Sequence, residues 1–123
     1  AASAAISNEE ICGLLLGVRG VSSILHCRNV HPDPTRNFEI DPAALIAAYR
    51  AQRSGGARII GCFHSHPSGS TSPSRRDAEA AAPNGWIWLI AAGCETAAWR
   101  AVRDGAVHGR FDPVALIETP PCA

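Results

Sequence analysis

Apolar positions along the chain fall into short blocks that turn residues separate. The nearly continuous apolar block at residues 11–18 predicts a buried strand, and residues 19–20 predict a hairpin turn into a second strand over residues 21–30. Residues 59–63 predict another short buried strand. The strongly apolar run at residues 86–92 predicts a strand that is covered on both faces. These blocks together indicate a sheet with buried central strands.

Helix signals stand between these strands. Residues 1–10 are Ala-rich and are interpreted as the last part of a helix or a frayed end. After a predicted loop at residues 31–37 and a short strand at residues 38–40, Asp41 and Pro42 form an N-cap and first-turn pair. They predict a helix through about Arg53, which Ser54-Gly55-Gly56 ends.

The last third of the chain predicts a hairpin and a final helix. Two further strands are expected at residues 94–102 and 106–110, joined by a turn of the Asp-Gly type at residues 103–105. Asp112-Pro113 predicts the start of a short helix, and Pro120-Pro121 ends regular structure. Strands that alternate with helices and hairpins predict an α/β fold, with a mixed β-sheet flanked by helices.

Length and charge narrow the classes of protein. A chain of 123 residues predicts one domain, residues 1–123, with a single buried core. Eleven basic and eleven acidic side chains cancel, so the total suggests neither a nucleic-acid footprint nor a membrane-binding patch. The apolar runs are too short to cross a bilayer, and no signal-peptide pattern opens the chain.

The five cysteines have no Cys-x-x-Cys spacing. Most of them stand within apolar segments, which is typical of small core residues. This pattern predicts a reducing, cytoplasmic location.

The candidate chemistry lies in residues 61–77. His64 and His66 stand one residue apart near the end of a strand and so point to the same face. Pro67 to Pro73 predicts a loop, because it holds two prolines, a glycine and four small hydroxyl residues. Ser74 is a good N-cap, and Asp77 then lies in the first helical turn facing back along the loop. Two histidines and one carboxylate leave a fourth position for water, the usual arrangement of a catalytic zinc site.

These residues resemble a known signature. His64-x-His66-Pro67, five further residues and Pro73-Ser74-x-x-Asp77 are similar to the motif of the JAMM (MPN+) zinc metalloproteases, here of the short prokaryotic type. The resemblance implies that His64, His66 and Asp77 hold one Zn²⁺ and that Ser74 helps to stabilise the tetrahedral intermediate. Residues 10–17 resemble the upstream element of the family, which implies that Glu10 is the general base. The resemblance also implies the deaminase-like three-layer fold of that family.

The resemblance extends to function. The family hydrolyses amide or isopeptide bonds at the C-terminal tails of ubiquitin-like proteins, and its short bacterial members resemble enzymes that trim sulfur-carrier proteins. It therefore implies a hydrolase whose partner is such a tail. The alternative is a catalytically silent scaffold of the MPN type, which keeps the fold and loses the ligands.

Other interpretations of the same residues stay open. Ser74 and Asp77 also fit a plain capping box, and either histidine alone fits a hydrogen-bonded strand residue. A non-haem iron site uses the same donor set, although Glu10 and Ser74 have no part in it. Cys62 beside the histidines suggests a thiol protein. The zinc deaminase and His-Glu-x-x-His motifs are absent from the sequence.

Three further residues compete for roles in the site. Glu9 is a rival for the role of base, and Glu10 is favoured because its spacing to Cys12 and Gly13 matches the family element. His26 and His31 have no partner at ligand spacing, so surface or hydrogen-bonded histidines are the favoured interpretation.

Overall fold

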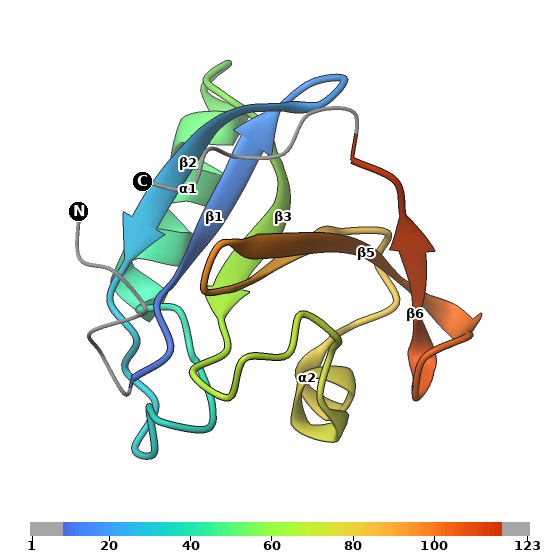
Figure 1. Cartoon of the computed structure of the whole chain (residues 1–123). Coiled ribbons are helices and arrows are strands. Elements are labelled where there is room, and N and C mark those ends of the chain that lie inside the picture. The colour runs from blue at the N-terminus through green and yellow to red at the C-terminus, as the bar shows by residue number, and fades with distance from the viewer. Residues whose placement is uncertain (1–8, 117–123) are drawn as a thin grey trace.

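The computed structural model describes residues 9–116, which form a mixed six-stranded sheet with two helices (Figure 1). The elements in chain order are β1 (Cys12–Gly17), β2 (Val21–Cys27), α1 (Pro42–Arg53), β3 (Ile59–Ser65), α2 (Arg75–Ala80), β4 (Ile87–Ala92), β5 (Glu95–Gly105) and β6 (Gly109–Val114). The strand order is β2-β1-β3-β4-β5-β6. β3 and β4 pair in parallel, and the other neighbours pair antiparallel. The predicted α/β class with a mixed sheet is confirmed.

Both helices pack on one face of the sheet. Leu14, Cys62 and Trp88 are register partners on three adjacent strands and therefore point to the same side. Ala48 of α1 packs in a cluster with Leu14, and Ala81 at the end of α2 packs in a second cluster with Cys62 and Trp88. The opposite face carries a third buried cluster, made by Leu15, Leu89 and Ala98. The start of α2 is thereby held close to the carboxyl end of β3.

The structure has a turn between β5 and β6, but the predicted position of this turn, residues 103–105, is wrong. β5 continues through Gly105, with Asp104 in the left-handed region at φ 57° and a shift in the β5–β6 register between Ala101 and Gly105. The chain turns at residues 106–108, where the Ala106 N–H donates to the Asp112 carboxylate over 2.9 Å. The Asp-Gly pair thus forms an irregularity within a strand instead of the hairpin turn.

The short helix predicted at Asp112-Pro113 is also wrong. Both residues belong to β6, where Asp112 pairs with Arg100 and Pro113 pairs with Trp99. β6 is the edge strand of the described sheet, and a proline is tolerated there because no described strand beyond it needs the missing N–H.

Two strand predictions are shortened. The strand predicted over residues 21–30 ends at Cys27, and the one predicted at residues 38–40 is a single bridge between Ile40 and Asn29. The predictions for residues 1–8 and for Pro120-Pro121 lie outside the described residues.

The cysteines divide between core and surface. Cys12 and Cys62 are buried free thiols and Cys27 is a partly buried one, as expected for small core residues. Cys94 lies exposed in the turn before β5 and is disulfide-bonded. None of the helices in residues 9–116 has the length and apolar character needed to cross a membrane.

Replacing Gly61 with alanine is expected to destabilise the fold by about 1–3 kcal/mol. A Cβ at this position would lie 1.9 Å from the Ile87 carbonyl oxygen, in the parallel β3–β4 pair that sets the site. The control is Gly20→Ala, because no heavy atom lies within 4 Å of a Cβ placed there. Urea unfolding of both variants measures the difference, and equal stabilities would contradict the close packing at Gly61.

Candidate metal centre

The end of β3 fixes two histidines. His64 is fully buried within the strand, beside Cys12 on β1 and Ile90 on β4. The next residues stay anchored, because the Ser65 hydroxyl accepts the Ile11 N–H over 2.8 Å and the His66 N–H donates to the Ala91 carbonyl over 2.8 Å. Both imidazoles therefore stand on a rigid support.

The first turn of α2 supplies the carboxylate. Ser74 is the N-cap, and its hydroxyl oxygen accepts the Asp77 N–H over 3.0 Å. The Asp77 carboxylate in turn accepts the Ser74 N–H over 2.9 Å, which completes a capping box. The capping interpretation of Ser74 and Asp77 is therefore confirmed, and the same contact holds the Asp77 carboxylate in one orientation.

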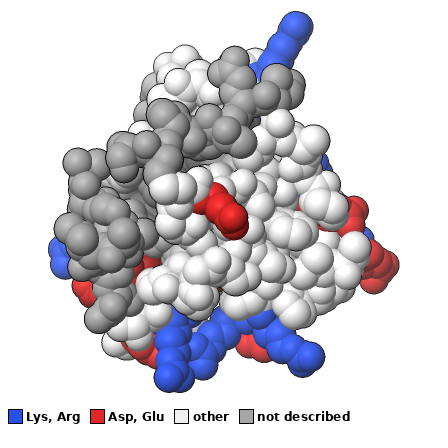
Figure 2. Space-filling model, in the orientation of Figure 1, with Lys and Arg blue, Asp and Glu red and all other residues white. Residues whose placement is uncertain are grey.

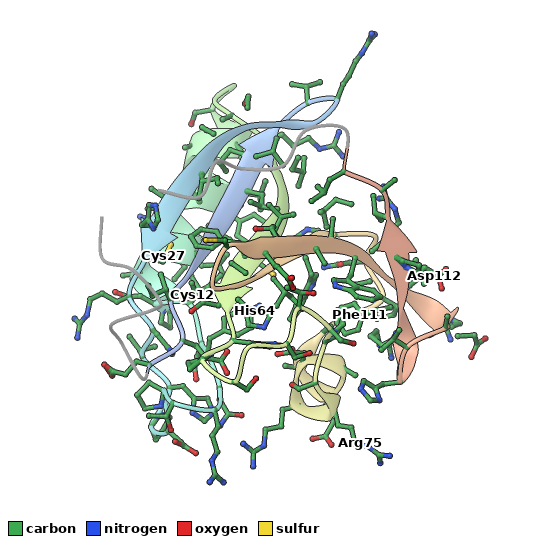
Figure 3. All side chains as sticks on the ribbon, viewed as in Figure 1. Cys12, Cys27, His64, Arg75, Phe111 and Asp112 are labelled. Carbon is green, nitrogen blue, oxygen red and sulfur yellow. The ribbon has the colours of Figure 1, made fainter. Side chains whose placement is uncertain are left out.

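Three donor atoms from these two elements converge. His64 Nε2 and His66 Nε2 lie 2.9 Å apart, and Asp77 Oδ2 lies 3.2 Å from the first and 3.0 Å from the second. With Glu10 they form a buried group whose ligand atoms all lie within 4.8 Å of one another. Figure 3 shows His64 in the interior, where β3 ends near the start of α2. A tetrahedral zinc ion with ligands at about 2.0 Å separates them by about 3.3 Å, so the spacing of these donors suits such an ion.

The surroundings of the two rings differ. His66 Nδ1 lies 2.8 Å from the Ser70 carbonyl, which can only accept, so Nδ1 carries the proton and Nε2 keeps a lone pair for a metal. The His64 ring stacks on Phe38 at 4.2 Å and meets Trp88 edge-on at 5.6 Å. Its Nδ1 atom is buried, and no hydrogen-bond partner for it exists among residues 9–116.

Burial and mutual contact set the charges of this group. Burial lowers the pKa of His64, which keeps its ring neutral and able to ligate a metal. Burial alone would raise the pKa of the Asp77 carboxyl, but hydrogen bonds with His64 and His66 outweigh it and hold that pKa well below its usual range. Burial acts to lower the pKa of His66, and the contact with Asp77 outweighs this and raises it. The group therefore contains an ionised carboxylate at neutral pH.

Glu10 is the fourth member of this group. It lies just before β1, and its Oε1 atom is 4.0 Å from His64 Nε2. Burial raises its pKa from 4.5 to about 7. Its Oε1 atom is buried, and the described residues offer it no hydrogen-bond partner. Backbone bonds from Glu10 N to Pro34 O at 2.7 Å and from the Asn29 side chain to Glu10 O at 2.9 Å hold it there.

The other candidate residues lie elsewhere. Glu9 is exposed, whereas Glu10 is only 5 % exposed. His26 packs edge-on against Phe63, and His31 Nδ1 accepts the Asp33 N–H, so neither histidine joins the group. Burial raises the pKa of the Cys62 thiol well above its ordinary value, which opposes the thiolate that redox chemistry needs.

A cleft opens beside the group. It has a volume of about 310 Å³ and lies between residues 35–36 and the loop at residues 67–74, with Glu10, His66 and Ser74 in its wall. Figure 2 shows basic side chains gathered along the lower margin of the molecule, where α2 and the loop after β2 lie in Figure 1. Arg36 is the basic residue that lines the cleft itself.

Replacing Glu10 with glutamine is expected to stabilise the metal-free protein at about pH 8 by on the order of 2 kcal/mol. Well below pH 4.5 the Glu10 carboxyl is protonated in both the folded and the unfolded chain, so its ionisation contributes nothing to stability there. As the pH rises from 4.5 through about 7, the unfolded chain releases its proton first and the folded parent loses relative stability. Urea unfolding in chelator at about pH 4 and about pH 8 measures this, and a difference independent of pH would contradict it.

The fold and the group together define an α/β domain with a candidate metal centre at the end of its parallel strand pair. The family model described as prokaryotic homologs of the JAB domain matches residues 1–103. The chain belongs to this family, which confirms the resemblance to the short prokaryotic JAMM type.

Curated relatives carry names that refer to conjugate cleavage. The chain is 39% identical over 69 residues to a probable TtuB-protein conjugate cleaving protease of Thermus thermophilus, a match that covers 56% of the chain and 47% of the relative. It is 34% identical over 84 residues to a desampylase of Haloferax volcanii, covering 66% and 60%. A desampylase of Pyrococcus furiosus is 33% identical over 85 residues, covering 68% and 60%. The chain thus spans about half to three fifths of the length of these relatives.

Solved structures share the architecture. The solution structure of a Desulfitobacterium hafniense protein superposes with a TM-score of 0.74 at 27% identity, covering 92% of this chain and 80% of that one. The solution structure of a Salinibacter ruber protein gives a TM-score of 0.59 at 26% identity, covering 97% and 86%.

Proposed function

We propose that this protein is a zinc metallopeptidase that hydrolyses amide or isopeptide bonds at the C-terminal tail of a ubiquitin-like or sulfur-carrier protein. The observation that carries this proposal is the convergence of His64, His66 and Asp77 beside Glu10, whose buried Oε1 atom has no hydrogen-bond partner among residues 9–116. The names of the relatives, which refer to TtuB conjugates and to desampylation, support a ubiquitin-like substrate.

His64, His66 and Asp77 would hold the ion. Two neutral imidazoles and one carboxylate leave a fourth position open, as catalytic zinc sites do. When bound, zinc supplies Lewis acidity, which lowers the pKa of water from about 15.7 to about 7 and polarises a carbonyl. The single negative charge of Asp77 leaves the site net positive, which favours an electron-rich carbonyl oxygen.

Glu10 is the proposed general base. Its carboxylate takes a proton from the attacking water and later gives that proton to the leaving amine. In the metal-free protein burial raises the pKa of this carboxyl to about 7, which makes it a stronger base than an exposed glutamate. Because Glu10 Oε1 has no hydrogen-bond partner among the described residues, this atom can accept the proton.

Ser74 is the proposed donor to the carbonyl oxygen as negative charge develops there. Its oxygen already accepts the Asp77 N–H, and no acceptor among residues 9–116 takes its own proton. The hydroxyl therefore has its proton free for the substrate. Removing one such donor typically lowers the rate by about 10²–10³-fold.

The cleft fits an extended, small-residue tail. Its walls between residues 35–36 and 67–74 carry mostly small hydroxyl side chains and proline, which leaves room for a Gly-rich segment. Main-chain hydrogen bonds give affinity for such a tail and demand little of its side chains. We further propose that residues 1–123 form one domain.

We propose a cytoplasmic location as well. The free thiols of Cys12, Cys27 and Cys62 suit a reducing compartment, and the bonded state of the exposed Cys94 is the feature that runs against it.

The test is hydrolysis by metal-free protein reconstituted in turn with zinc, manganese and iron(II). Substrates are aminocoumarin amides of several ubiquitin-like and sulfur-carrier domains, with a short unrelated peptide amide as the control. We expect zinc to restore cleavage of at least one domain amide, and a chelator to abolish it again. Tight zinc binding without any cleavage would leave the scaffold function, and no metal binding would overturn the proposed centre itself.

A further inference from the structure

Two side chains of the β5–β6 hairpin hold the loop that carries Ser74. This segment, residues 67–74, is called the Ser74 loop below. The Trp99 indole N–H donates to the Thr71 carbonyl over 2.9 Å, and His108 Nε2 lies 3.1 Å from the Pro73 carbonyl, to which it must donate. The partners stand 28 and 35 residues apart in the chain, so only the fold brings them together.

The Ser74 loop is bonded to the candidate metal centre on its other side. The Ser70 carbonyl accepts the proton of His66 Nδ1 over 2.8 Å, and the Ser74 N–H donates to the Asp77 carboxylate. Movement of the loop backbone therefore has two effects. It displaces the Ser70 carbonyl, which orients the His66 ring, and it displaces the Ser74 hydroxyl.

The middle of this loop is held by side-chain contacts and not by a backbone ladder. Residues 70–73 make no backbone-to-backbone hydrogen bond to any described residue. Gly69, at φ 94°, has a conformation that only glycine adopts readily. Besides the bond between Ser70 and His66, the bonds from Trp99 and His108 are the side-chain hydrogen bonds that join residues 70–73 to the sheet among the described residues.

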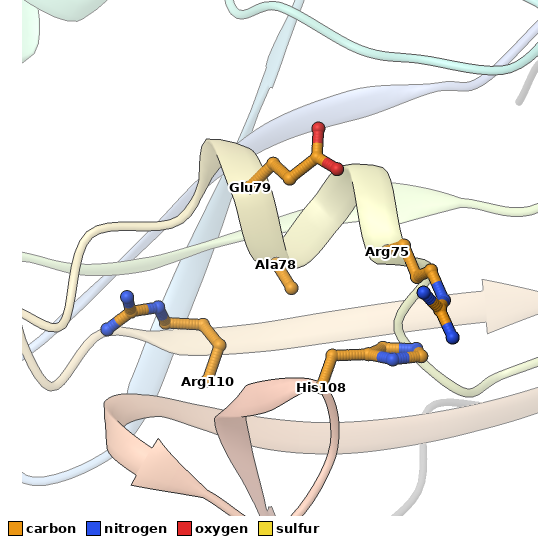
Figure 4. A pocket seen from close by; sticks show the side chains of 5 residues that line it. All are labelled: Arg75, Ala78, Glu79, His108 and Arg110. Carbon is orange, nitrogen blue, oxygen red and sulfur yellow. The ribbon is translucent and has the colours of Figure 1, made fainter.

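His108 adopts an uncommon backbone conformation to make its bond. It lies in the left-handed region at φ 52°, which costs a residue other than glycine free energy. Figure 4 shows its ring below the first turn of α2, beside the Arg75 side chain, while Arg110 extends toward the other side. The side chains drawn in Figure 4 line a cavity of about 370 Å³. This cavity is separate from the cleft beside the metal centre, so His108 contacts the loop from outside that cleft.

We propose that Trp99 and His108 are positioning residues that clamp the Ser74 loop. His108 holds the Pro73 carbonyl and thereby fixes the position of the Ser74 hydroxyl. Trp99 holds the Thr71 carbonyl, which fixes the adjacent Ser70 carbonyl and so the orientation of the His66 ring. The proposal rests on the proposed function for its kinetic readout, and its metal readout stands independently of catalysis. A displacement of about 1 Å in a reacting group costs up to about 10²-fold in rate, so loss of one clamp bond is expected to cost about tenfold.

The first test compares two substitutions of His108 with opposite backbone preferences. Asparagine tolerates the left-handed conformation but is too short to reach Pro73, whereas glutamine places its amide near the position of Nε2. We expect His108→Asn to lower kcat about tenfold at unchanged KM on the best aminocoumarin amide, and His108→Gln to recover most of this loss. If His108 served stability alone, asparagine would be the better tolerated variant, and that order of activities would overturn the proposal.

A double-mutant cycle locates the effect. Ser74→Gly removes the hydroxyl and keeps a residue that is tolerated as an N-cap. In that background we expect His108→Asn to lower kcat by less than about twofold, because the group it positions is gone. A full tenfold loss in the Ser74→Gly background would show that His108 does not act through Ser74.

The second test measures zinc affinity by competition with a chromogenic chelator. Loss of a direct partner of a ligating histidine typically weakens metal binding about 10–100-fold, so Trp99→Phe, one step further away, is expected to weaken it about 3–10-fold. Trp86→Phe is the matched control, since Trp86 makes no hydrogen bond to the loop. Thermal unfolding of every variant checks that it folds.

The outcomes separate the two proposals. An active, zinc-binding parent whose Trp99→Phe and His108→Asn variants match it in zinc affinity and kcat would overturn the clamp alone. A parent without zinc-dependent hydrolysis would overturn the proposed function, while weaker zinc binding by Trp99→Phe would still support the clamp.

Discussion

Replacing Glu10 with glutamine is expected to lower kcat/KM by about 10²–10⁴-fold, the range that general acid–base catalysis contributes, and to leave zinc affinity close to that of the parent. Glutamine has the same shape but cannot take a proton from water. In the parent, Glu10 Oε1 lies 4.0 Å from His64 Nε2, beside the three proposed ligand atoms. The substitution therefore leaves His64, His66 and Asp77 in place as ligands. The measurement is hydrolysis of an aminocoumarin amide together with metal content.

The neighbouring carboxylate provides the control. Glu9→Gln changes the same chemical group one residue earlier, at an exposed position. Near-parental activity of Glu9→Gln beside an inactive Glu10→Gln would support the assignment of the base. Equal losses in both variants, or loss of zinc from Glu10→Gln, would contradict it.

The parts of the site that could be predicted from the sequence are those made by local chain geometry. His64 and His66 share a strand face because of the two-residue period, and Ser74 with Asp77 is recognisable as the start of a helix. These four side chains stand within 14 residues of chain, counted from 64 to 77, so local rules alone place them near one another. Glu10 is different, since only its resemblance to the family element indicated it.

The contacts that cross the sheet could not be predicted. Nothing in the sequence around Trp99 points to a distant partner, yet its indole N–H donates to the Thr71 carbonyl. No local pattern marks His108 either, because its conformation depends on where the β5–β6 turn falls. That turn was itself misplaced, since the Asp104-Gly105 signal produces an irregularity inside β5 when Asp112 caps the turn from β6.

Replacing Asp77 with asparagine is expected to weaken zinc binding by more than about 10²-fold and to abolish measurable hydrolysis, since loss of a ligand exceeds the 10–100-fold effect of losing one of its partners. Hydrogen bonds with His64 and His66 hold the pKa of the Asp77 carboxyl well below its usual range, so the parent carries a full negative charge here at neutral pH. Asparagine keeps an oxygen that can accept the Ser74 N–H, so the helix cap is expected to persist.

The matched control for this variant is Glu79→Gln, which removes a carboxylate from the same helix but outside the metal group. Competition with a chromogenic chelator gives both affinities, and thermal unfolding in chelator separates folding from ligation. Parental zinc affinity in Asp77→Asn would show that the two histidines bind the ion with some other partner. An equal loss of zinc affinity in Glu79→Gln would contradict the assignment of Asp77 as a ligand. It would show that any negative charge on α2 raises zinc affinity, whether or not the carboxylate contacts the ion.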